Sequence, residues 1–260
     1  MRFIRKILII LLFASANLLF AQEELPVQRW YLGLSIGVGT MDMNSNSIDL
    51  NVINHTNPVG GIFVQYQLNE QLSLRLGAEF DKREFGLQLG YQGMRYDDTS
   101  TYVCYSCSYE YNITYSNYYL TFPLLFQYSK STNKFAFNFK GGLYYSFLLS
   151  SYQYGYEELY IDPVEGLPFY HLDNNIEPGL FRIVYRGETE NIINTYDAGI
   201  MLGIGGTYVL SNKMAILLEG NMQVGFQSVF LNPTMINLMH RSFQLRGGLI
   251  YRLNLNRIRQ

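Results

Sequence analysis

The chain of 260 residues has few charged residues, three histidines, two cysteines and one tryptophan. Charged residues are 15% of the sequence, against about a quarter in a typical soluble domain. Aromatic residues, in contrast, are 16% and include 23 Tyr and 17 Phe. A water-soluble protein of this composition would need an unusually large core. The scarcity of charge therefore favours a protein that exposes aromatic side chains to something other than water.

The sequence also lacks a basic surplus and, beyond residue 21, a long apolar run. Its formal net charge is −2 and its pI is near 5.9, which disfavours nucleic acid as a partner. No later segment approaches the run of about 18 apolar residues that predicts a transmembrane helix. A closed β-barrel is the other structure that satisfies all backbone groups inside a membrane, so it is the remaining membrane-spanning option.

The N-terminus has the features of a secretory signal. The opening MRFIRK is basic, and an apolar run from Ile7 to Phe20 follows it. This pattern predicts a signal peptide over residues 1–21, cleaved after Ala21 or, alternatively, after Ala16, with an uncleaved anchor as a further alternative. We therefore expect an exported protein whose mature part is residues 22–260.

Segments of alternating apolar residues recur along the rest of the chain, as strands with one greasy face require. Eight such segments are present, near 30–40, 62–68, 72–80, 118–128, 135–147, 196–208, 214–226 and 243–253. The turns near 69–71, 130–134 and 210–213 are short, whereas the segments near 42–58, 91–116, 151–195 and 229–241 are long and polar. Short turns that alternate with long external loops are typical of outer-membrane barrels.

The predicted fold is therefore all-β: an eight-stranded, antiparallel, up-and-down transmembrane β-barrel. A further hairpin within 151–195 would raise the number of strands to ten. A soluble β-sandwich or a lipocalin-like barrel is the alternative, although neither has a reason to sort its loops by length.

The segment NYYLTFPLLFQY carries an apolar face between Tyr118 and Tyr128. Ten residues of strand, tilted as in a barrel, project to about 25 Å, the height of the apolar band of such proteins. Pro123 lies on the opposite face and lacks a ladder donor, which predicts a bulge or widened pairing beside it. Aromatic residues at strand ends are candidates for the interfacial girdle: Trp30, Tyr118, Tyr128, Tyr208 and Tyr251.

Charged residues fall on the faces opposite the apolar positions. Since charge at mid-strand is costly against lipid, these side chains are expected to point inward. The set is Arg75, Glu79, Asp81, Lys140, Asp197, Glu219, Arg246 and Arg252. A packed lumen held by salt bridges is the favoured interpretation, because eight strands leave just enough room for side chains. An ion or solute pathway and catalytic carboxylates are the alternatives.

The apolar set changes from even to odd positions after Phe80. This change predicts either a bulge or a strand that has left the membrane and continues as an external hairpin. Residues 81–84, DKRE, suit the level of the lipid headgroups.

The residues that could support chemistry are few. Cys104 and Cys107 are candidates for a small structural disulfide in an oxidising compartment, with free thiols or a redox pair as alternatives. His55, His171 and His240 each fall in a predicted external loop, so no strand carries a histidine. We therefore predict no catalytic residues, no metal and no cofactor.

Tyrosine is concentrated in two of the predicted external loops. Its large amphipathic side chain is common in recognition loops. The candidates for recognition are Tyr102, Tyr105, Tyr109, Tyr111, Tyr154, Tyr156 and Tyr160. The alternative is a strand extension whose tyrosines pack on one another above the membrane.

The strand series resembles the small outer-membrane β-barrel family that is often labelled porin-family or PorT-like. The resemblance covers roughly residues 28–254 and is carried by YYLTFPLLFQY at 118–128, GGLYYSFLLS at 141–150, DAGIMLGIGGTYVL at 197–210 and LRGGLIYRL at 245–253. It implies an eight-stranded barrel in a Gram-negative outer membrane, without shared catalytic residues.

The hypothesis that follows is a barrel with a filled lumen whose loops bind a partner. It would be an accessory subunit of a secretion, assembly or uptake complex, or a surface adhesin. The expected partners are outer-membrane lipid and other outer-membrane or periplasmic proteins. A narrow porin-like channel and a barrel-embedded hydrolase are the alternatives.

Overall fold

The structure is a computed structural model that describes residues 30–45, 51–95, 103–161, 179–189, 191–232 and 238–253. The predicted signal peptide and both candidate cleavage sites lie outside these ranges. Within them, no helix is long and apolar enough to cross a membrane.

The described chain is built from strands. Their bounds are β1 (Trp30–Ser45), β2 (Asn51–Asn54), β3 (Thr56–Gln67), β4 (Leu72–Arg95), β5 (Val103–Thr132), β6 (Phe135–Ile161), β7 (Gly179–Glu188), β8 (Tyr196–Val209), β9 (Met214–Ser228) and β10 (Leu238–Arg252).

Eight of these strands close into a ring. The order is β4-β3-β1-β10-β9-β8-β6-β5, and pairing of β5 with β4 closes the barrel. All the pairs in the ring are antiparallel. The predicted all-β, eight-stranded antiparallel barrel is therefore confirmed. β2 and β7 stay outside the ring, since β2 pairs with the distal part of β4 and β7 with the distal part of β6.

The outer face of the ring is apolar, and the inner face is polar. In β10, for example, buried and exposed residues alternate, so that Phe243, Leu245 and Leu249 face outward. Ile36 on β1 is 68% exposed. Exposure of so large an apolar side chain to water would be unfavourable. A continuous outward band of this kind is what lipid requires of a barrel.

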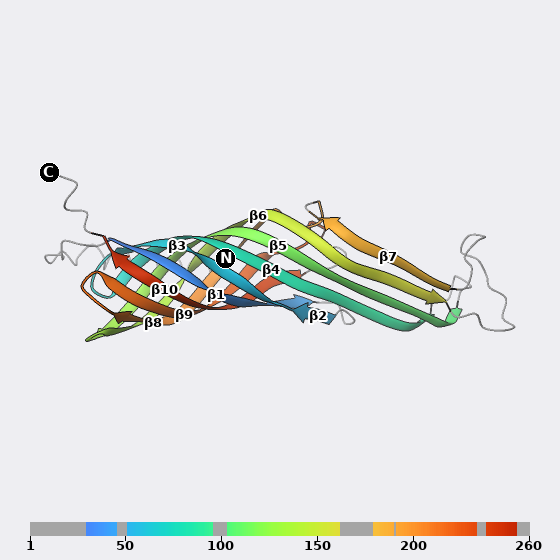
Figure 1. Cartoon of the computed structure of the whole chain (residues 1–260), viewed down its shortest axis with the longest axis horizontal. Helices are drawn as coiled ribbons and strands as arrows, with labels where there is room; N and C mark the ends of the chain where they lie inside the picture. The colour runs from blue at the N-terminus through green and yellow to red at the C-terminus, as the bar shows by residue number, and fades with distance from the viewer. Residues whose placement is uncertain are drawn as a thin grey trace, which may run out of the picture.

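Three strands are much longer than a membrane crossing needs. β4, β5 and β6 contain 24, 30 and 27 residues, whereas about 9–11 residues span the bilayer. They run on together past the ring, with β7 alongside (Figure 1). We call residues 51–54, 85–95, 103–117, 151–161 and 179–188 the external sheet, because long extensions of such barrels face away from the periplasm.

The external sheet changes the picture of the predicted loops. Much of 42–58, 91–116 and 151–195 is strand, and part of 229–241 belongs to β10. The described parts of these segments form the strand extension that the sequence left as the alternative for the tyrosine-rich loops. Polar and tyrosine side chains pair there across antiparallel strands.

Pro123 interrupts one ladder and not the other. Between β4 and β5, Phe122 and Pro123 have no partner, while the pairs on either side keep the same register. Pro123 still lies opposite Tyr144 of β6. A Cβ placed on Gly77 would be 3.0 Å from Pro123 Cγ, so glycine at this position makes room for the ring. The pairing is interrupted beside Pro123 without the bulge that the sequence also allowed.

The register of β4 does not slip after Phe80. Phe80 pairs with Leu120 and Phe85 with Tyr115 in one register, so the bulge is wrong at this point. The alternative, a strand that continues beyond the membrane part, agrees with the length of β4. Odd-numbered residues point inward from Ser73 to Leu87. The lining changes from charged at Arg83 to apolar at Phe85. Asp81 therefore faces the lumen and not the headgroups, because its inward parity is unbroken.

Candidate functional site

The lumen contains a first charge cluster made of Arg75, Glu79, Lys140, Glu219 and Arg246. Arg75 Nη1 lies 2.9 Å and Lys140 Nζ lies 2.6 Å from Glu219 Oε2. Arg246 donates to both carboxylate oxygens of Glu79. All five side chains are buried, so each charge is compensated by a direct partner, as buried charges require.

A second charge cluster lies further from the short turns and is organised by Arg83. The guanidinium donates to Asp81 Oδ2 and to Asp197 Oδ2, each at 2.7 Å. Asp197 Oδ2 also accepts from the Tyr144 hydroxyl at 2.9 Å and lies 3.2 Å from His240 Nδ1. The guanidinium carbon of Arg83 lies 4.5 Å from the centre of the Tyr119 ring, which caps it by a cation–π contact.

Arg83 and His240 were both missed from the sequence. His240 lies in β10 and is buried, so the prediction that no strand carries a histidine was wrong. The five residues of its segment, LMHRS, show little alternation of apolar residues, so the sequence predicts a loop there. Arg83 could have been found, because it continues the odd-numbered series of Arg75, Glu79 and Asp81.

The buried charges of the lumen balance. Among the residues that the structure describes, four buried cationic residues (Arg75, Arg83, Lys140, Arg246) accompany four buried anionic ones (Glu79, Asp81, Asp197, Glu219). Arg252, also predicted to be a member, is only partly buried and belongs to neither cluster.

Apolar side chains close the lumen beyond the second charge cluster. We call them the apolar plug. Its members come from four strands and from the segments before β8 and after β9: Met41, Phe85, Leu87, Ile113, Tyr115, Ile193, Val229, Phe230 and Leu238. A backbone bridge joins Ile193 to Phe230, and the Tyr115 and Phe230 rings meet edge to face at 5.4 Å. The plug is therefore a packed apolar layer beyond the second charge cluster.

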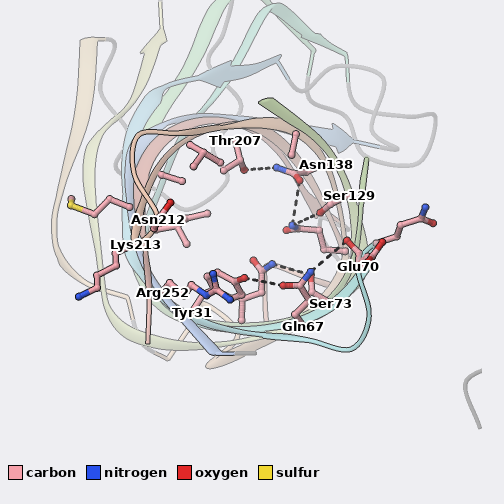
Figure 2. Close-up of a pocket in the computed structure, with 18 of the residues that line it drawn as sticks. Tyr31, Gln67, Glu70, Ser73, Ser129, Asn138, Thr207, Asn212, Lys213 and Arg252 are labelled. Carbon is pink, nitrogen blue, oxygen red and sulfur yellow. Dashed lines mark hydrogen bonds between the residues drawn. The ribbon is translucent and has the colours of Figure 1, made fainter. Parts of the chain in front are cut away.

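At the opposite end, the lumen opens into a polar vestibule with a volume of about 340 Å³. Residues of the short turns and of the strand ends surround it, including Glu70, Lys213 and Arg252 (Figure 2). Tyr31 donates to Gln67 at 2.9 Å, and Asn138 donates to Thr207 at 2.7 Å. Phe63, Leu217 and Ile250 pack as a small apolar cluster, and Ile250 also lines the vestibule.

The predicted aromatic girdle divides between the two ends of the barrel. Trp30, Tyr128, Tyr208 and Tyr251 are exposed near the short turns, and the Trp30 ring lies 4.7 Å from that of Tyr66. Tyr118 lies at the other end, where its ring is 5.8 Å from that of Phe80. Aromatic side chains at both ends of a barrel are typical of an interfacial girdle, and this role stays a prediction for these residues.

The predicted recognition tyrosines are mostly hydrogen-bonded within the external sheet. Glu157 accepts from Tyr109 at 2.9 Å and from Tyr185 at 2.6 Å. Tyr156 donates to Glu110 at 2.9 Å, and the hydroxyls of Tyr111 and Tyr115 lie 3.3 Å apart. The hydrogen bond to Glu157 raises the pKa of Tyr185 to about 12. Acidic residues thus fix tyrosines in place across neighbouring strands.

Other predicted positions are placed only in part. Tyr154 is exposed, and its hydroxyl is 3.4 Å from Glu84. The side chains of Cys104, Cys107, Tyr105 and Tyr160 lie outside what the structure describes, as does the whole of Tyr102. Met94 pairs with Cys104 beside a register shift, and the disulfide stays a prediction.

His240 and Asp197 form a pair of the type that hydrolases use, but their surroundings argue against catalysis. Both side chains are buried, with the salt-bridged Arg83 beside them and the apolar plug beyond. A catalytic base must be within reach of the proton of a bound substrate. His55, the other histidine that the structure describes, lies apart from this pair, 3.5 Å from Glu84.

Comparisons with known proteins bear on the barrel as a whole. A family model described as outer membrane protein beta-barrel domain matches residues 20–231. It shows the barrel family, whereas the finer PorT-like label stays a prediction. No curated protein matches the chain.

Several solved structures are similar at low identity. OprG from Pseudomonas aeruginosa is 10% identical, with a TM-score of 0.45 over 87% of this chain and 97% of that one. Neisserial surface protein A is 10% identical, with a TM-score of 0.41 over 86% and 97%. The outer membrane protease OmpT from Escherichia coli is 10% identical, with a TM-score of 0.37 over 90% and 99%.

Proposed function

The chain belongs to the outer membrane protein beta-barrel domain family, and on that premise we propose that it is a closed barrel that binds a partner protein through its external sheet. In this proposal it acts as an accessory subunit of a secretion, assembly or uptake complex, or as a surface adhesin. The barrel anchors the sheet in the Gram-negative outer membrane.

The observation that supports the proposal is the packing of side chains inside the barrel. Two buried charge clusters, whose charges balance when they are taken together, lie in it, and the apolar plug packs beyond them. A channel needs a continuous polar path, and a buried salt-bridge network with an apolar cover offers none. The function then falls to the surfaces outside the lumen.

The external sheet has the size and the order that a binding surface needs. About 15 residues of β5 lie beyond the ring, which at about 3.3 Å per residue is roughly 50 Å of strand. Glutamates hold its tyrosines in fixed positions, so little conformational entropy is lost when a partner binds. Tyr152 and Tyr154 remain 45% and 48% exposed on its outer face.

Photo-crosslinking in intact cells tests the proposal. We expect the protein to crosslink to a defined partner, and we expect the double variant Tyr152→Ala/Tyr154→Ala to lose that product. Tyr208→Ala is the matched control, because it removes an exposed tyrosine near the short turns. Equal crosslinking by all three proteins, or no product from any of them, would contradict the proposed function.

A further inference from the structure

β7 is an edge strand along its full length. All ten of its residues pair with β6, and among the described strands it pairs with no other. In an antiparallel sheet, alternate residues direct their N–H and C=O groups to opposite sides. About half of the residues of β7 therefore present backbone donors and acceptors at a free edge, which is what an added strand binds.

The edge lacks most of the devices that prevent strand addition. Natural edges are shortened, bulged or interrupted by proline. The sequence GLFRIVYRGE has no proline, and its pairing with β6 has no register shift. Ile183 and Val184 are 56% and 69% exposed, and a Cβ on Gly187 would meet no heavy atom within 4 Å. A long, regularly paired edge with two exposed β-branched side chains is therefore open to a partner.

The charges on one face of β7 restrict what that partner can be. Arg182 and Arg186 flank Val184 on this face. Arg182 is already paired with Glu158 at 3.0 Å and lies over the Tyr156 ring at 4.5 Å. Arg186 is exposed and has no ion-pair partner among the described residues. An acidic residue directly opposite Arg186 would form a favourable cross-strand pair.

A second copy of the protein is a poor occupant of this edge. Two copies in one membrane are inserted in the same orientation, so their β7 strands run in the same direction. Antiparallel pairing between them is therefore excluded by the membrane, and only the less stable parallel ladder remains. The occupant is accordingly a different protein.

We propose that the edge of β7 binds an extended strand of a partner protein by antiparallel β-addition. The partner strand carries an acidic residue opposite Arg186 and an apolar, β-branched residue opposite Val184. This inference rests on the proposed function and deepens it, because it gives the binding mode and the chemistry of the partner's segment.

The test uses the full-length protein in lipid nanodiscs and fluorescent synthetic peptides of about nine residues, the upper range of ordinary strand lengths. The peptide has the central pattern glutamate–threonine–valine and threonine elsewhere. We expect saturable binding. We expect Arg186→Glu to weaken it about fivefold, as expected for one cross-strand charge pair, and Lys134→Glu, at a short turn, to leave it unchanged.

Two methylated peptides separate a backbone ladder from simple charge attraction. One carries N-methyl groups on its odd amides and the other on its even amides, so only one of them blocks the groups that face β7. We expect one peptide to lose binding and the other to retain it.

Three results would overturn the inference: equal binding of both methylated peptides, no saturable binding up to about 1 mM, or dimerisation that Arg186→Glu abolishes. The proposed function is tested separately. A crosslinked partner that is lost in the Tyr152/Tyr154 variant would support it even if the peptides failed to bind.

Discussion

Replacing Arg83 with methionine is expected to destabilise the barrel strongly, whereas the same change at the adjacent Lys82 is not. Both residues are ion-paired in the structure. Arg83 lies inside, between Asp81 and Asp197, and Lys82 lies outside, 2.5 Å from Glu84. The two substitutions therefore compare a lumen charge with a surface charge at neighbouring positions of one strand.

The expected magnitudes follow from burial. Removing one partner of a buried ion pair leaves an uncompensated charge and costs about 3–5 kcal/mol. Asp197 keeps its contacts with Tyr144 and His240, so we expect about 3 kcal/mol for Arg83→Met, at the low end of that range. An ion pair near the surface contributes about 0–1 kcal/mol, which is the expectation for Lys82→Met.

Urea unfolding from lipid vesicles measures both variants, with the fluorescence of Trp30, the single tryptophan of the sequence, as the signal. Adding Asp197→Asn to Arg83→Met should recover part of the lost stability, because it removes one of the buried carboxylates that Arg83→Met leaves without a cation. Similar free energies of unfolding for the two methionine variants would refute the assignment of Arg83 to a buried network.

Three further predictions concern other parts of the barrel. Gly77→Val should destabilise the barrel by about 1–3 kcal/mol in urea unfolding, since the new side chain meets the ring of Pro123. Pro123→Ala should relieve this loss. An equal loss with proline and with alanine at position 123 would refute the contact. Glu157→Gln should lower the pKa of Tyr185 from about 12 towards its usual value near 10, as followed by ¹³C-tyrosine NMR. Because the pKa of Tyr185 is raised in the folded protein, the stability from this contact is complete below pH about 10 and falls as the pH rises through the folded pKa. An unchanged pKa of Tyr185 in the Glu157→Gln variant would contradict the role of this hydrogen bond. Phe230→Ala should cost about 3–5 kcal/mol and speed hydrogen exchange across the apolar plug, and unchanged exchange would argue against a sealed end.

The alternation of apolar residues was enough to predict the ring. Lipid on one side of a closed sheet forces a period of two, as in Leu120, Phe122, Leu124 and Phe126 of β5. The same rule failed beyond the membrane. Above Arg83 the inside of the barrel becomes apolar, so the pattern inverts although the strand continues, and an inverted pattern resembles a slipped register.

The second charge cluster could not be predicted as a unit. Arg83 meets His240 across 157 positions of sequence and Asp197 across 114, and no local spacing reports such contacts. The sequence alone shows that Arg83 continues the odd-numbered, inward-facing positions of its strand. The burial of His240, in contrast, depends on how far β10 extends. The free edge of β7 likewise depends on the strand order. β8 pairs with the membrane part of β6, and β7 pairs only with its distal part, so β7 has no neighbour on its other side among the described strands.

Single-channel recording in planar lipid bilayers tests the central claim of a sealed lumen most directly. The purified protein should insert without steady ionic current over a wide range of salt, because paired charges and the apolar plug close the barrel. Reproducible conductance steps of defined size from the wild-type protein would contradict the claim and would favour a channel.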